Sequence, residues 1–112
     1  MNEKEITKFV EKLEGYDEER VVERDGQRER RLRVFRREGK IFLVILKGSD
    51  PLRIEVRCDG KLGKLLRGQY ESVMLSRSLG GNGVEVICSG QLARDEIFDL
   101  VRHSYISAGL AG

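Results

Sequence analysis

The chain of 112 residues is long enough for one hydrophobic core and too short for two, so we expect a single domain over residues 1–112. Apolar residues make up 39% of the sequence, which argues against wholesale disorder, and charged residues make up 36%, which predicts a surface dense in charge of both signs. The formal net charge is only +2, so total charge alone does not indicate a nucleic-acid partner.

The chain begins Met-Asn-Glu-Lys-Glu-Ile, which is charged and unlike a signal peptide. The longest strongly apolar run, Ile41 to Leu46, is far shorter than the roughly 20 residues of a membrane-spanning helix. We therefore expect a cytoplasmic protein that does not interact with membranes.

Residues 2–13 are predicted to form an amphipathic helix, because apolar residues recur three and four positions apart. Asn2 is the expected N-cap, and Gly15 the expected stop. The apolar positions are Ile6, Phe9, Val10 and Leu13.

Three strands joined by tight turns are expected next, over residues 21–23, 31–36 and 41–46. Asp25-Gly26 and Glu38-Gly39 supply the turns. In the second strand, alternation predicts that Leu32 and Val34 point to the core, and the opposite face would carry Arg31, Arg33 and Phe35. The third strand is almost continuously apolar, which places it near the centre of a sheet.

A loop over 48–51 should lead to a strand over 53–58, in which Ile54, Val56 and Cys58 point inward and Arg53, Glu55 and Arg57 outward. Asp59 is a plausible cap for a helix over 61–70, whose expected buried face is Leu62, Leu65, Leu66 and Tyr70.

The remaining elements are a short strand over 73–75, a turn or loop over 78–83, a strand over 84–88 and a helix over 95–106, with residues 109–112 frayed. Short connections between successive strands require antiparallel pairing. The sequence thus predicts an α+β fold in which helices pack on one face of an antiparallel sheet.

Several short segments carry a family resemblance. They are Gly39-Lys40-Ile41-Phe42, the run from Leu52 to Asp59 that ends in Cys-Asp, Leu65-Leu66, Gln69-Tyr70, and the run from Asp95 to Tyr105 that ends in Ser-Tyr. With these segments the chain resembles the MmcQ/YjbR family of small bacterial domains. The resemblance implies helices on one face of a curved antiparallel sheet, a YjbR-like arrangement that has been compared with double-wing nucleic-acid-binding proteins.

Two segments depart from that family. Its members usually carry a His-Met-Asn-Lys stretch and a Trp before the last strand, where this chain reads Ser78-Leu-Gly-Gly-Asn-Gly-Val84. The arginine-rich segment 27–37 is also unlike the family. The resemblance therefore assigns no role to either segment in this chain.

Catalytic and metal-binding patterns are not recognisable in the sequence. Cys58 and Cys88 lie in apolar runs and, with the lone His103, cannot supply the four ligands of a zinc site. The glycines at 80–83 lack the Gly-Lys-Ser/Thr signature of a phosphate loop. The carboxylates are interleaved with Lys and Arg, so none stands out as an acid/base pair. We expect no enzyme activity, no catalytic residue, no metal site and no cofactor.

The strongest functional signal is the segment from Arg20 to Lys40, where eight Arg and one Lys stand against four carboxylates. If its strands share a sheet with 53–58, one outer face would carry the predicted nucleic-acid-binding residues Arg31, Arg33, Phe35, Arg53 and Arg57. Guanidinium groups pair well with phosphate oxygens, so this face could follow a DNA or RNA backbone.

Two other interpretations remain open for this segment. Cross-strand Arg–Glu pairs on an exposed sheet are ordinary and discourage aggregation. The same face could instead bind a protein partner, which would make the chain a protein–protein interaction module with no nucleic-acid or catalytic activity. We expect the chain to be a monomer or a weak homodimer.

Overall fold

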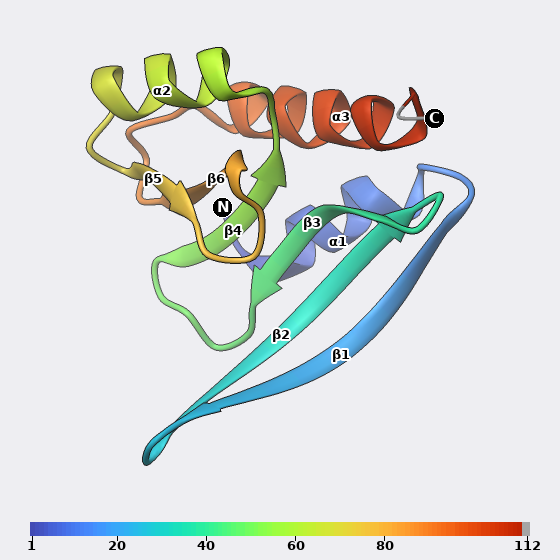
Figure 1. Cartoon of the computed structure of the whole chain (residues 1–112), viewed down its shortest axis with the longest axis vertical. Helices are drawn as coiled ribbons and strands as arrows, with labels where there is room; N and C mark the ends of the chain where they lie inside the picture. Colours follow the sequence, from blue (N-terminus) through green and yellow to red (C-terminus); the bar gives the residue numbers. More distant parts are fainter. Residues whose placement is uncertain (111–112) are drawn as a thin grey trace.

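The computed structural model describes residues 1–110, which form a six-stranded antiparallel sheet and three helices (Figure 1). The strand order is β1-β2-β3-β4-β6-β5, which leaves β1 and β5 as edges. The elements are α1 (Glu3–Glu11), β1 (Tyr16–Asp25), β2 (Arg28–Arg37), β3 (Lys40–Leu46), β4 (Leu52–Arg57), α2 (Gly60–Gln69), β5 (Val73–Ser76), β6 (Gly80–Cys88) and α3 (Arg94–Leu110). The α+β prediction is confirmed.

The predicted helix starts are confirmed by their caps. The Asn2 side chain accepts a hydrogen bond from the Glu5 amide at 2.9 Å, and that of Asp59 accepts one from the Leu62 amide at 2.8 Å. Each bond satisfies an amide that the first helical turn leaves free. The last helix is longer than predicted, since residues 109 and 110 are helical. The rest of the predicted frayed end, residues 111–112, lies outside the described residues.

Strands β1 and β2 form one long hairpin, where the sequence predicted two short strands. Each has ten residues, so the hairpin extends roughly 33 Å at about 3.3 Å per residue. Its far half, which includes the turn at Gly26, projects away from the body of the molecule, at the opposite end from α2 (Figure 1). Ion pairs across the two strands, such as Arg30 with Glu23, support this extension.

The main core lies between the sheet and the helices. It includes Ile6 and Val10 from α1, and Ile97 and Val101 from α3. Phe35 belongs to this core, where only 1% of its surface is exposed and its ring packs against Tyr16 and Phe42. Helices therefore cover the face that Phe35 occupies.

A second, smaller cluster lies on the opposite face of the sheet. It consists of Leu32, Val34 and Val44, with Val21, Ile41 and Leu46 packed around them. The predicted sidedness of β2 was therefore wrong, since Leu32 and Val34 point away from the helices and Arg33 and Phe35 point toward them. Both faces of β2 bury apolar side chains, so alternation alone did not identify the main core.

The turn between β5 and β6 closes over the carboxylate of Glu55. This carboxylate accepts hydrogen bonds from the Ser76 hydroxyl at 2.6 Å, the Ser78 amide at 2.8 Å and the Ser78 hydroxyl at 2.9 Å. Glu55 lies on the face away from the helices, as expected, yet it is only 2% exposed. Three donors compensate the cost of burying this charge.

Two further predictions required correction. Strand β6 begins at Gly80, so most of the expected loop over 78–83 is strand. Leu65 was expected on the buried face of α2, but it is 64% exposed. The residue of α2 that packs closely on the sheet is Gly63, against Cys58 and Val84. The absence of a side chain at Gly63 lets the helix backbone approach the sheet. Among the described residues, no helix is long and apolar enough to cross a membrane.

Candidate nucleic-acid interface

Arg33 lies at the centre of the sequence-predicted site and is buried. Its guanidinium forms a bidentate pair with Glu18, from Nε to Oε2 at 2.9 Å and from Nη2 to Oε1 at 3.0 Å. Its Nη1 donates to Glu3 at 3.2 Å and to the hydroxyl of Thr7 at 2.7 Å. Arg33 thus fastens β2 to both β1 and α1, and little of its donor capacity is left for a ligand.

The hydrogen bonds from Arg33 hold the pKa of the Glu18 carboxyl below its ordinary value, against the opposing effect of burial. The same bonds to Glu18 raise the pKa of Arg33. Both groups therefore stay charged at neutral pH, and their charges compensate each other inside the fold.

The other predicted residues do not join Arg33. Arg53 lies on the face away from the helices and pairs with the buried Glu85, from Nη1 to Oε2 at 3.1 Å. Arg57 lies on that face too and donates from Nε to the carbonyl of Ile41 at 2.9 Å. The predicted common face of Arg31, Arg33, Phe35, Arg53 and Arg57 was therefore wrong, because the sidedness of β2 is reversed.

Arg31 remains exposed and has different neighbours from those predicted. It lies directly opposite Val22 in the hairpin, on the same face as Arg20 and Arg24 of β1. We call Arg20, Arg24 and Arg31 the distal arginine cluster. Their side chains are 67%, 78% and 71% exposed. The sequence did contain a signal for them, since all three share a face once β1 is extended to ten residues.

The carboxylates near the distal arginine cluster are few. Arg31 and Arg24 both approach Glu29, at 2.9 and 3.7 Å, and Arg20 lies 3.8 Å from Glu18, which is already paired with Arg33. Since the charges of Glu18 and Arg33 compensate, three arginines face one remaining carboxylate. The distal part of this face, beyond Arg33, therefore carries an excess of two positive charges.

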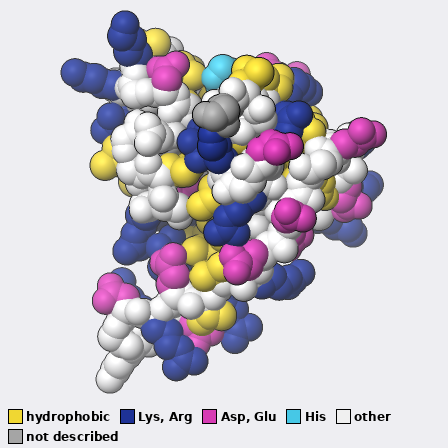
Figure 2. All heavy atoms as spheres, turned by 45° about the vertical axis from the view of Figure 1, so that its right-hand side comes forward, with side chains coloured by type: hydrophobic (Ala, Val, Ile, Leu, Met, Phe, Trp, Pro, Cys, Tyr) yellow, Lys and Arg dark blue, Asp and Glu magenta, His cyan; other side chains and the backbone are white. Residues whose placement is uncertain are grey.

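The opposite face of the hairpin has a different balance. Its acidic residues are Asp17, Glu19, Glu23 and Asp25, and its arginines are Arg28, Arg30 and Arg36. Two of these form cross-strand pairs, Arg30 with Glu23 at 3.3 Å and Arg36 with Glu19 at 2.8 Å. Because side chains alternate between the two faces along β1 and β2, the excess positive charge lies on one face of the hairpin. From the side, Figure 2 shows basic and acidic side chains interleaved along the hairpin at the bottom of the view.

Groups with catalytic potential are sparse in the described part of the chain. No set of three His, Cys, Asp or Glu side chains within residues 1–110 lies close enough to hold a metal ion. His103 is exposed on α3. Burial raises the pKa of Cys58 above its ordinary value and that of Cys88 to about 11, so both thiols are protonated at neutral pH.

Comparison with known proteins bears on the fold alone. No protein-family model and no curated protein matches the chain. The solved structures that are similar to it include the following two. One is the Deinococcus radiodurans protein DR2400, described by the domain DUF419, with a TM-score of 0.72 and 18% identity over 97% of this chain and 79% of that one. The other is a structural-genomics target from Pseudomonas syringae, with a TM-score of 0.74 and 16% identity over 96% of this chain and 99% of that one.

Proposed function

We propose that this chain is a non-enzymatic, cytoplasmic nucleic-acid-binding module of the MmcQ/YjbR type, which contacts phosphate groups through the distal arginine cluster. The observation that supports this most directly is the charge on that face of the hairpin, where three exposed arginines meet one carboxylate that is not engaged elsewhere. The proposal replaces the binding face predicted from the sequence and keeps only Arg31 from it.

A phosphate group can compete with the carboxylate of Glu29 for these arginines. Exposed ion pairs contribute only about 0–1 kcal/mol, so Glu29 holds its two arginines weakly. A phosphate offers the same bidentate geometry to a guanidinium and brings further charge along the backbone. The far half of the hairpin projects away from the body of the molecule (Figure 1), and Arg24 and Arg31 are exposed there. The comparison of YjbR-like folds with double-wing nucleic-acid-binding proteins points the same way, as an analogy of fold.

Fluorescence anisotropy with labelled duplex and single-stranded DNA and RNA of random sequence tests the proposal. If all three arginines contact phosphate, affinity for a duplex should fall about 40-fold between about 50 and 200 mM salt, from a slope of about −0.9 per phosphate contact. The variant R20Q/R24Q/R31Q should bind at least about tenfold more weakly at the lower salt concentration and show a flatter salt dependence.

The matched control is K4Q/K8Q/K12Q, which removes three exposed positive charges from the region of α1. It should keep most of the affinity, because those lysines lie outside the hairpin. Equal losses in the two variants would mean that only total charge matters. Absence of binding at tens of micromolar protein and low salt would overturn the proposal.

A protein-interaction role has one specific observation in its favour, which is the length of the open edge at β1. This strand has ten residues, pairs only with β2, and carries five acidic residues against two arginines. An extended basic peptide could add to this edge as a further strand, whereas self-pairing of two acidic strands is disfavoured. Binding of a protein partner that persists in R20Q/R24Q/R31Q, together with no nucleic-acid binding, would favour this alternative.

A further inference from the structure

Helix α2 carries basic residues and no acidic residue of its own. Between Gly60 and Gln69 there are three basic residues and no acidic one. Within residues 1–110, Lys61 and Lys64 have no ion-pair partner, and Arg67 donates from Nε to the carbonyl of Gly63 at 3.3 Å. The nearest acidic residues in the sequence are the cap Asp59 and Glu71, outside the helix. This contrasts with the hairpin, where most arginines have carboxylate neighbours.

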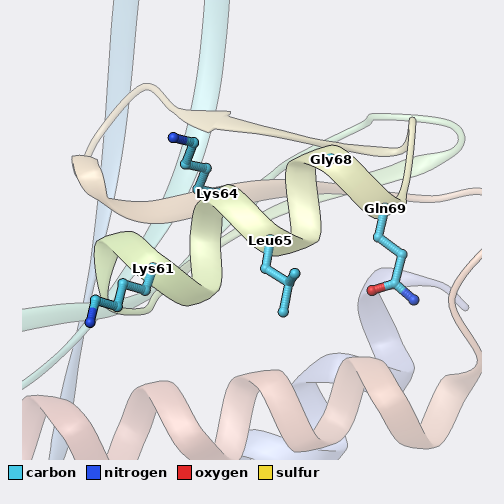
Figure 3. A pocket seen from close by; sticks show the side chains of 5 residues that line it. All are labelled: Lys61, Lys64, Leu65, Gly68 and Gln69. Atoms are coloured by element: carbon cyan, nitrogen blue, oxygen red, sulfur yellow. The ribbon is translucent and has the colours of Figure 1, made fainter.

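An exposed leucine lies among these cations. Leu65 is 64% exposed, one helical turn after Lys61 and next to Lys64. Gly68 leaves open space beyond it, since nothing lies within 4 Å of the position that a Cβ would occupy. The result is a shallow depression of about 620 Å³ along the helix. In Figure 3, Leu65 and Gln69 point to one side of α2, Lys64 points to the opposite side, and Lys61 extends beyond the amino end of the helix.

A second depression of about 690 Å³ continues toward the amino end of α2 and shares Lys61 and Leu65 with the first. The half-buried Leu62 lines it as well. The two depressions together make a strip along the helix, with Leu65 at its centre, Lys61 and Lys64 beside it, and the cap residue Asp59 at its amino end. We call this strip the α2 strip.

We propose that the α2 strip binds an acidic amphipathic segment of a partner protein. An apolar side chain of that segment would cover Leu65 and fill the space beside Gly68. Two carboxylates of the segment would pair with Lys61, one turn before Leu65, and with Lys64, the residue directly before it. This mode is the helix-in-groove recognition in which apolar anchors supply affinity and flanking charges supply orientation. The inference goes beyond the proposed function and concerns the opposite end of the molecule from the projecting hairpin (Figure 1).

The physical features of the strip favour an acidic peptide over other anionic ligands. A nucleic-acid backbone would use Lys61 and Lys64 and leave Leu65 exposed, because a phosphate chain offers it no apolar surface. An anionic membrane would need a much larger apolar face than one exposed and one half-buried leucine. A segment that carries both apolar and acidic side chains can cover Leu65 and also pair with Lys61 and Lys64.

The probe is a labelled helical peptide of about 18 residues with leucines three and four positions apart on one face and glutamates flanking them. Anisotropy measures its affinity, and ¹⁵N chemical-shift mapping of the full chain locates its site. We expect micromolar binding, with the largest shifts at residues 60–70. Either Leu65→Asn or K61Q/K64Q should weaken binding at least about tenfold.

Matched controls separate specific docking from charge attraction. Leu75→Asn changes an exposed leucine on β5, and K4Q/K8Q removes two exposed lysines from α1, so both should bind like the unmodified chain. The variant R20Q/R24Q/R31Q should also bind the peptide normally, which keeps this test independent of the nucleic-acid test. Since Leu65 is exposed, Leu65→Asn should leave the free energy of unfolding nearly unchanged.

Three results would overturn the inference. One is no binding of the peptide at several hundred micromolar. The second is equal binding of a peptide with the same composition in scrambled order, which would reduce the effect to charge. The third is tighter binding of phosphatidylglycerol vesicles or duplex DNA with the same dependence on Lys61, Lys64 and Leu65, which would assign the α2 strip to that ligand.

Discussion

Arg33 and Glu18 lie on neighbouring strands, 15 positions apart in sequence, and meet in a bidentate ion pair on the face that α1 covers. The pair marks the point where the hairpin leaves the body of the molecule. On the side of the body, Phe35 belongs to the core, and on the distal side the arginines are exposed. Arg33 is therefore a structural residue, whereas Arg31, two positions earlier, is available to a ligand.

Replacement of Arg33 by alanine should destabilise the fold by about 2–4 kcal/mol, because it leaves the partly buried carboxylate of Glu18 without its main partner. Arg31→Ala removes an exposed arginine from the same face and should cost less than about 0.5 kcal/mol. Urea unfolding followed by circular dichroism measures both. Equal effects of the two substitutions would contradict the structural role of Arg33.

The same ion pair predicts a dependence of stability on pH. Because the pKa of Glu18 is lowered in the folded state, its contribution is complete above the ordinary value of 4.5 and is lost as pH falls through the folded-state pKa. The difference in unfolding free energy between the unmodified chain and Arg33→Met should therefore be largest near neutral pH and shrink below pH 4.5. Arg31→Met provides the baseline. A difference that stays constant down to acid pH would contradict this assignment.

The carboxylate of Glu55 should hold the turn between β5 and β6. Glu55→Ala leaves the hydroxyls of Ser76 and Ser78 and the Ser78 amide without their acceptor, so we expect a loss of about 2–3 kcal/mol. Ser78→Ala removes only one hydroxyl donor and should cost about 1 kcal/mol. In the double variant the two costs should be less than additive, since both substitutions break the same bond. Strict additivity would show that the two side chains act independently.

Replacement of glycine by alanine should have opposite effects on stability at Gly83 and at Gly68. A Cβ on Gly83 would lie 2.6 Å from the carbonyl oxygen of Val56, so Gly83→Ala should destabilise the sheet by at least about 2 kcal/mol. A Cβ on Gly68 would meet no atom within 4 Å, so Gly68→Ala should stabilise α2 by up to about 1 kcal/mol. Thermal unfolding of both variants checks the pair. A shift of the melting temperature in the same direction for both would contradict the close approach of β6 to β4.

The features that could be predicted from the sequence are those set by neighbouring residues. The caps at Asn2 and Asp59 and the turn at Gly26 depend on chemistry within a few positions, and each lies where expected. The α+β class followed from the short connections between strands. The apolar run from Ile41 to Leu46 correctly indicated a strand in the interior of the sheet.

The sidedness of β2 could not be predicted, because it depends on contacts between distant segments. Both faces of β2 bury apolar residues, so the choice between Phe35 and Val34 as the main core residue depends on where α1 and α3 pack. The partner of Arg33 is fixed by strand pairing and by α1. The exposure of Leu65 has a similar origin, since the helical period identifies an apolar face but not the side on which the sheet lies.

The division of the hairpin at Arg33 also has an evolutionary consequence. Residues beyond Val21 and Leu32, which are the last hairpin residues in the smaller apolar cluster, are largely exposed, as Arg24 and Arg31 are. Substitutions there alter the surface at almost no cost to folding, whereas substitutions at Phe35 or Arg33 do not have this freedom. Descendants of this chain can therefore change the charge at the tip of the hairpin while the fold stays constant.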